Sequence, residues 1–101
     1  MGVSRPRVVV NPKALKLARR NACERCGRWG PTQVHHVIAR GMGGGRRCDE
    51  AWNLIALCPG CHRAYHDGRV PRSELVAIVC RREGITQDEW VSKARILEAR
   101  I

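Results

Sequence analysis

The apolar positions of this chain fall into short groups separated by polar and glycine-rich segments. Residues 33–38 and 53–57 are two brief apolar-rich runs, each with the length of a strand rather than of a helix. A segment rich in glycine and arginine, residues 40–47, lies between them. We therefore predict a β-hairpin in the middle of the chain, with residues 33–38 as its first strand and residues 53–57 as its return strand.

Helical patterns flank this predicted hairpin on both sides. Asn11 can cap a helix that has Pro12 at its first position, which predicts a short basic helix over residues 11–21. A second helix is expected to begin at about His62, directly after the return strand and a cysteine pair. Helices and a paired hairpin in one short chain predict the α+β class.

Two further helices are expected at the C-terminal end of the chain. The apolar spacing over residues 72–83 is helical, and Gly84 can end that helix. Thr86 begins a capping box, which is followed by a helical apolar stripe made of Trp90, Ala94, Leu97 and Ile101. We expect this helical pair, within residues 71–101, to cover the core, and the alternative is a face that binds a partner.

The chain is 101 residues long, which predicts a single domain over residues 1–101. Its core is expected to be thin, because the chain has no phenylalanine, one tyrosine and three tryptophans. A chain of this length buries only about two-thirds of its unfolded surface. Something other than apolar burial is therefore expected to help hold the fold together.

The cysteine pattern predicts a zinc ion that would help to stabilise the fold. Cys23 and Cys26 form one C-x2-C pair, and Cys58 and Cys61 form another, a spacing that lets four thiolates meet at one tetrahedral zinc ion. The segment between the pairs is long enough to hold the hairpin. A redox-active pair is the alternative, but no thioredoxin-like βαβ pattern surrounds it. The two remaining cysteines are expected to be packing residues: Cys48 and Cys80.

All four histidines lie between the cysteine pairs or just after the second pair. His62 and His66 are four residues apart, so on a helix they share one face and can bind one metal ion. His35 and His36 are neighbours on a strand and point to opposite faces, which predicts different roles for them. We expect the four imidazoles to converge on one side of the fold.

The charge of +10 is distributed unevenly. Residues 1–47 carry eleven basic side chains and one acidic side chain, whereas residues 48–101 carry eight of each. This favours a one-sided contact with a polyanion, most simply nucleic acid, and the alternative is a basic N-terminal tail without a specific role. The arginines expected to bind phosphate are Arg19, Arg20, Arg40, Arg46, Arg47 and Arg63.

The lengths of the apolar runs also limit where in the cell the protein is expected to be. None approaches the length of a membrane span, and the N-terminal run is too short for a signal-peptide core. We therefore expect a cytoplasmic protein without a membrane partner, with its cysteines reduced.

Residues 34–38, residues 52–62 and His66, together with both cysteine pairs, resemble the HNH endonuclease family, in particular its small zinc-knuckle members from phages and bacteria. The three letters of the family name fall on His36, Asn53 and His62. The resemblance implies a ββα-metal core over residues 23–67, of the His-Me finger or treble-clef-like kind. It also implies DNA as substrate, a phage or mobile-element origin, host cytoplasm as location, and phage terminase or other packaging proteins as partners.

The same resemblance implies the site residues. His36 matches the general base, and Asn53 matches the residue that braces the loop and orients the base. The ligands of a catalytic divalent metal match His35, His62 and His66. Three imidazoles without a carboxylate favour Zn, Ni, Co or Mn, and Mg remains open through phosphate oxygens.

Two alternatives to a metal-dependent DNA endonuclease stay open. A non-catalytic zinc-knuckle module that binds nucleic acid explains the charge and the cysteines equally well. An interaction protein whose histidines hold a second structural zinc is the other alternative. Metal content discriminates among them, because a nuclease needs one tight zinc and one weaker, exchangeable metal.

Overall fold

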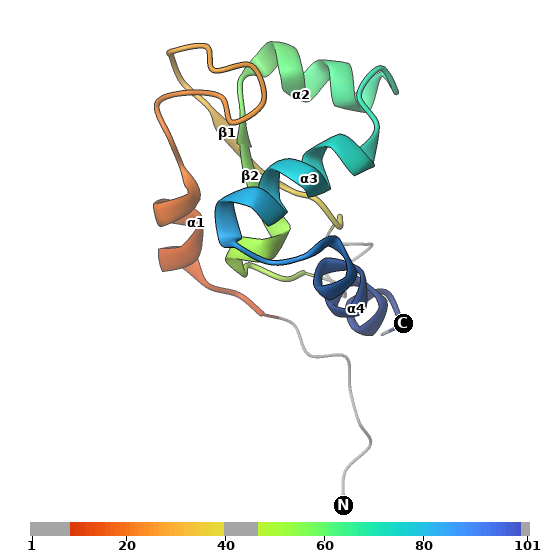
Figure 1. Cartoon of the computed structure of the whole chain (residues 1–101). Coiled ribbons are helices and arrows are strands. Elements are labelled where there is room, and N and C mark those ends of the chain that lie inside the picture. The colour runs from red at the N-terminus through yellow and green to blue at the C-terminus, as the bar shows by residue number, and fades with distance from the viewer. Residues whose placement is uncertain (1–8, 40–46, 100–101) are drawn as a thin grey trace, which may run out of the picture.

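The structure is a computed structural model that describes residues 9–39 and 47–99. Two strands, five helical segments and their connections form an α+β fold, which confirms the predicted class (Figure 1). Arg40 and Arg46 lie outside the described residues. The elements in chain order are α1 (Pro12–Ala18), β1 (Gln33–His36), the 3-10 turn η2 (Ala51–Asn53), β2 (Leu54–Leu57), α2 (Pro59–His66), α3 (Arg72–Glu83) and α4 (Gln87–Glu98).

The two strands form the predicted antiparallel hairpin, with Gln33 opposite Leu57 and His36 opposite Leu54. Every residue of β2 is buried, whereas β1 is partly exposed. In Figure 1, α1 stands to the left of the hairpin, α2 lies at its upper end and α3 passes in front of it. Among the described residues, no helix is long and apolar enough to cross a membrane.

The core lies between β2, α3 and α4. Ile55 and Leu57 pack with Leu75, Val79 and other buried side chains in one cluster. Trp90 anchors α4 to this core, because its Nε1 donates a hydrogen bond to the carbonyl oxygen of Trp52 at 2.8 Å. The two indole rings meet edge to face with centroids 5.8 Å apart. The C-terminal helices therefore cover the core, as the apolar stripe predicts.

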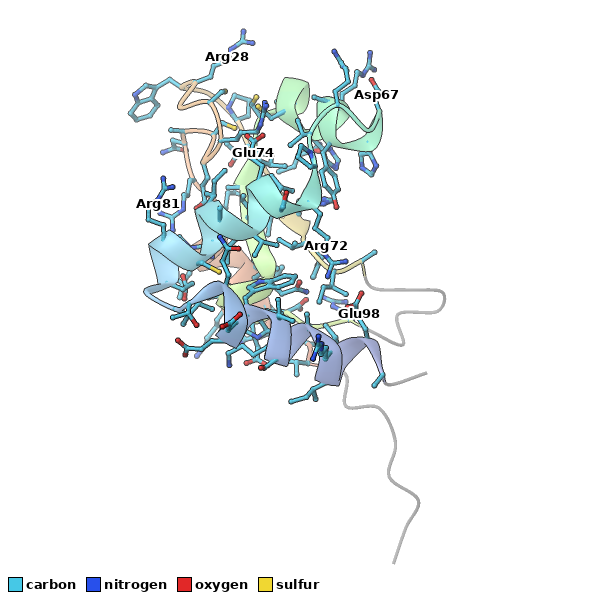
Figure 2. All side chains as sticks on the ribbon, turned by 45° about the vertical axis from the view of Figure 1, so that its right-hand side comes forward. Arg28, Asp67, Arg72, Glu74, Arg81 and Glu98 are labelled. Carbon is cyan, nitrogen blue, oxygen red and sulfur yellow. The ribbon has the colours of Figure 1, made fainter. Side chains whose placement is uncertain are left out.

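Contacts at the ends of α3 and α4 fix where these helices begin and end and how they pack against each other. Gly84 ends α3 in the left-handed conformation, with a φ of 68°, and Thr86 begins α4 with the predicted capping box. Arg72 at the start of α3 lies 3.4 Å from Glu98 at the end of α4, and Figure 2 shows the two side chains bridging the helices.

The first helix starts as predicted but ends earlier. The side chain of Asn11 accepts a hydrogen bond from the backbone of Ala14, as an N-cap does. The helix stops at Ala18 instead of continuing to residue 21. The hydroxyl group of Thr32 donates to the carbonyl oxygen of Arg20 and accepts from the Arg20 backbone N–H, so this tertiary contact holds the chain in an extended conformation.

The other boundaries differ by a few residues. β1 ends at His36 because the pairing is not completed beyond it. The Val37 N–H still donates to the Asn53 carbonyl oxygen opposite it, but the Asn53 N–H donates to Glu50 instead of returning the bond, and the Ile38 N–H donates to the Asn53 side chain. Asn53 itself belongs to η2, so β2 begins one residue later than expected. α2 begins at Pro59, before His62, because the sulfur of Cys58 accepts from the Cys61 backbone and caps the helix.

Candidate metal centres and active site

The four paired cysteines converge at the junction of the first knuckle with α2. Their Sγ atoms all lie within 4.8 Å of one another, and those of Cys26 and Cys58 are 3.8 Å apart. Four thiolates around a zinc ion at the usual bond length of about 2.3 Å are separated by about 3.8 Å. The cluster therefore fits a structural zinc, as the spacing predicts.

The pKa values of two thiols in this cluster shift in opposite directions, because burial raises the pKa of Cys61 to about 12. Burial raises the pKa of Cys23, but backbone N–H groups, led by those of Cys26 and Cys58, outweigh it and lower that pKa to about 6. The guanidinium of Arg25 lies 3.5 Å from the sulfur of Cys61 and 2.6 Å from Glu74 on α3. The positive charge of Arg25 beside the sulfur thus ties the cluster to Glu74 of α3, which Figure 2 labels.

A buried ion pair connects the knuckle to the hairpin. Glu24 lies between the two cysteines of the first pair and accepts a hydrogen bond from the backbone of Ala56 on β2 at 2.8 Å. Arg82 of α3 contacts both carboxylate oxygens of Glu24, at 2.7 and 2.9 Å. The same guanidinium donates to the carbonyl oxygens of Ala51 and Leu54. Nothing in the sequence pattern predicts this ion pair, because its contribution to stability depends on the burial of the two side chains.

Three histidines form a second cluster, on the face of β1 that meets α2. One ring nitrogen from each of His35, His62 and His66 lies within 4.8 Å of the other two, and the Nε2 atoms of His62 and His66 are 3.0 Å apart. The Nε2 atom of His35 is buried and has no hydrogen-bond partner. Since a buried polar atom ordinarily has a partner, this orphaned nitrogen fits a metal ligand.

His36 points elsewhere, so the expectation that all four imidazoles converge is wrong. Its Nε2 atom lies 2.7 Å from Oδ1 of Asp49, because neighbouring strand residues face opposite sides. The Asp49 side chain is fully buried and also contacts the guanidinium of Arg47 at 2.9 Å and the backbone N–H of Asn11 at 2.9 Å.

Asp49 is a site residue that the sequence reasoning missed. Burial opposes its ionisation, but hydrogen bonds from Arg47 and His36 outweigh burial and lower its pKa to about 2. The signal in the sequence is weak: Asp49 is the first of two adjacent acids that follow the basic segment and Cys48, shortly before Asn53. Only the fold shows that this acid is buried against a histidine.

Asn53 connects the two ends of the glycine- and arginine-rich segment. Its fully buried amide accepts from the backbone of Ile38 at 2.8 Å. It donates to the carbonyl oxygens of Ile38 and of Cys48, at 3.3 and 3.0 Å. A carboxylate could not make the two donated bonds, so this position needs an amide.

Comparison with known proteins places this arrangement in a family. Residues 23–68 match the family described as HNH endonuclease. This match spans just under half of the chain. Over 53 residues the chain is also 42% identical to the type IV methyl-directed restriction enzyme EcoKMcrA of Escherichia coli (strain K12). That match covers 44% of this chain and only 18% of the relative.

The HNH segment contains both cysteine pairs and all four histidines, and the resemblance deduced from the residues is confirmed. The family match implies a catalytic divalent metal and DNA as substrate, and both are proposals for this chain. The knuckle, the hairpin and α2 are the elements within the match, whereas α1, α3 and α4 lie outside it.

Electrostatics in the HNH histidine cluster favour metal binding. Burial, followed by repulsion from His62 and His66, lowers the pKa of His35 to about 4. Burial and the neighbouring His66 also lower the pKa of His62. Neutral imidazole is the form that binds a metal, so these ligands are ready at neutral pH. The ring of Tyr65 packs edge-on against His35 with centroids 5.0 Å apart and limits its movement.

The arginines expected to bind phosphate do not form one patch around the HNH site. Arg19 and Arg47 line a common groove beside His36. Arg20 instead pairs with Glu24 at 3.7 Å, and Arg63 is exposed on α2. Of the described arginines in this set, Arg19 and Arg47 therefore share the groove beside His36, whereas Arg20 and Arg63 do not line it.

Proposed function

We propose that this chain is a metal-dependent endonuclease that hydrolyses phosphodiester bonds in DNA. The observation that carries the proposal is the unpartnered, buried nitrogen of His35 facing His62 and His66 within an HNH segment. A purely structural module has no need of three neutral imidazoles gathered beside a separate histidine–carboxylate pair. The alternative of a non-catalytic zinc-knuckle module leaves both features without a role.

The proposed chemistry divides between the two faces of β1. When bound by His35, His62 and His66, a divalent metal would supply polarisation of the phosphate and stabilisation of the departing oxygen. The donor set favours Zn, Ni, Co or Mn, because all three ligands are imidazoles. Four thiolates would hold the structural zinc separately, so the two metals have different donors and different affinities.

His36 is the proposed general base. Its Nε2–H donates to the ionised carboxylate of Asp49, so Nδ1 carries the free lone pair and can take a proton from water. Asp49 is a positioning residue, since it holds the ring and its tautomer through one hydrogen bond. Asn53 is proposed to brace the segment ends through its three amide hydrogen bonds.

Cleavage of supercoiled plasmid by the purified, zinc-loaded protein across a metal series tests the proposal. We expect nicked or linear product with an added divalent metal and none with a chelator. The variant His36→Ala should lose cleavage while its zinc content and DNA binding stay unchanged. Cleavage by this variant at the wild-type rate would show that His36 is not the base. Two tightly held zincs and no cleavage would instead favour the interaction-protein alternative.

The resemblance also carries a finer proposal about context. It implies a phage or mobile-element origin, action in the cytoplasm of the host, and a terminase or another packaging protein as partner. These statements remain predictions. Co-purification of the chain with a terminase subunit, and a change in its cutting rate when that subunit is added, would support the packaging role over homing or restriction.

A further inference from the structure

The helix α1 is attached to the rest of the fold mainly at its two ends. At the start, the backbone N–H of Asn11 donates to Asp49. Beyond its end, the Arg20 backbone exchanges hydrogen bonds with the hydroxyl group of Thr32, just before β1. No residue of α1 is buried. A helix that is hydrogen-bonded at its ends and only half-buried at Ala14, Leu15 and Ala18 leaves space between itself and the strand.

That space is a groove of about 670 Å³ between α1 and β1. Lys16, Arg19 and Arg47 supply positive charge along it, and Leu15 and Val34 supply apolar surface. No acidic side chain lines the groove in the part of the chain that the structure describes. His36, the proposed base, is also one of the lining residues.

We propose that this groove binds the sugar–phosphate backbone of one DNA strand next to the bond that is cut. The inference rests on the proposed function, because it places the strand beside His36. Lys16 and Arg19 form no ion pair within the described residues, so their charges can complement the phosphates, and the two aliphatic side chains suit the apolar faces of the sugars. A groove of this volume accommodates a small ligand and cannot enclose a duplex, so it takes a single backbone.

The three cations differ in how firmly they are held. Arg47 is fixed by the buried carboxylate of Asp49, at 2.9 Å, and this contact gives it a defined position beside His36. Lys16 and Arg19 are exposed on α1 and can adapt to the strand. Asp49 thereby links the groove, the base and the start of α1 through His36, Arg47 and Asn11.

Affinity for a fluorescent DNA duplex, measured by anisotropy on the zinc-loaded protein without a second added metal, tests the groove. We compare the double variant Lys16→Gln/Arg19→Gln with a control, Lys13→Gln/Arg95→Gln. The control also loses one lysine and one arginine, but its exposed positions on α1 and α4 do not line the groove.

The groove variant should bind roughly tenfold more weakly than the control at low salt, and its plot of log affinity against log salt should be shallower by roughly 1.8, the value for two lost contacts with B-form DNA. Equal affinities and equal slopes for the two variants would overturn the proposal. If wild type cuts DNA and the variants are equal, only the groove is wrong. If wild type neither binds nor cuts DNA, the proposed function itself fails.

A second measurement does not depend on the charge change. A photo-crosslinking amino acid placed at Leu15, inside the groove, should form an adduct with DNA. The same amino acid at Ile96, which is 59% exposed on α4, should not. Adducts at position 96 and none at position 15 would overturn the proposal.

Discussion

Asp49→Asn removes one negative charge from a fully buried side chain that contacts His36, Arg47 and the backbone of Asn11. The fold lowers the pKa of this carboxyl from 3.8 to about 2. Each pKa unit corresponds to about 1.4 kcal/mol, so ionised Asp49 stabilises the fold by roughly 2–3 kcal/mol. Because the folded pKa is the lower one, this stabilisation is complete above pH 3.8 and is lost as the pH falls towards 2.

We therefore expect Asp49→Asn to lower the free energy of unfolding by about 2–3 kcal/mol at pH 7. The variant should also cut DNA more slowly, by roughly 10²- to 10⁴-fold, the usual contribution of a positioned base. The physical reason is the tautomer of His36: an amide NH2 group facing Nε2 moves the ring proton to Nδ1, where the lone pair is needed.

Urea denaturation followed by tryptophan fluorescence gives the stability, and single-turnover nicking of plasmid gives the rate. Asp88→Asn is the matched control, because Asp88 is exposed in the first turn of α4 and the substitution is the same. It should cost less than about 1 kcal/mol and leave the rate unchanged. Wild-type stability in Asp49→Asn would refute the electrostatic argument, and a wild-type rate in the folded variant would refute the role of Asp49 in holding the base.

Three further predictions concern the supports of the site. Cys58→Ser should lose its zinc and unfold, as metal analysis and circular dichroism would show, and a folded, zinc-free variant would contradict the structural role. Arg82→Met removes the closer of the two guanidinium groups that pair with Glu24, which is 8% exposed, and should cost about 3–5 kcal/mol in urea denaturation, whereas Arg81→Met at the exposed neighbouring position should cost little. In protein without a second added metal, the proton NMR signals of His35 should titrate at about pH 4, and because this pKa lies below the ordinary value of 6.5, stability should fall as the pH drops from 6.5 to 4. A midpoint near 6.5 would contradict this burial argument.

Local signals in the sequence account for most of the fold. A cap at Asn11, a capping box at Thr86 and a glycine at position 84 each act within one turn of helix, so the sequence predicts α3 and the start of α4 closely. The boundaries that differ are set by distant partners. α1 ends shortly before Arg20, whose backbone N–H donates a hydrogen bond to the hydroxyl group of Thr32. The periodicity of the sequence cannot predict a contact between residues twelve positions apart.

The same distinction holds for the site. Fixed spacings bring the two cysteine pairs together and place His62 and His66 on one face of α2, so both clusters could be anticipated. The contact of Asp49 with His36 and the ion pair of Glu24 with Arg82 could not be anticipated from the sequence. Each depends on the burial of an acidic side chain, which only the fold shows. Sequence charge suggested one basic surface, whereas the fold separates Arg20, paired with Glu24, from the groove that Arg19 lines.

Alternation along β1 gives the site its two sides. His35 faces α2 and the other two metal-binding candidates, and His36 faces Asp49 and the groove below α1. Slipping β1 by one residue against β2 would exchange these faces and point the proposed base at the metal. Asn53 opposes that slip, because its amide holds Ile38 at one end of the intervening segment and Cys48 at the other. The proposed role of Asn53 as a brace would thus affect the chemistry through the register of the hairpin, since its side-chain hydrogen bonds go to the backbone of Ile38 and Cys48.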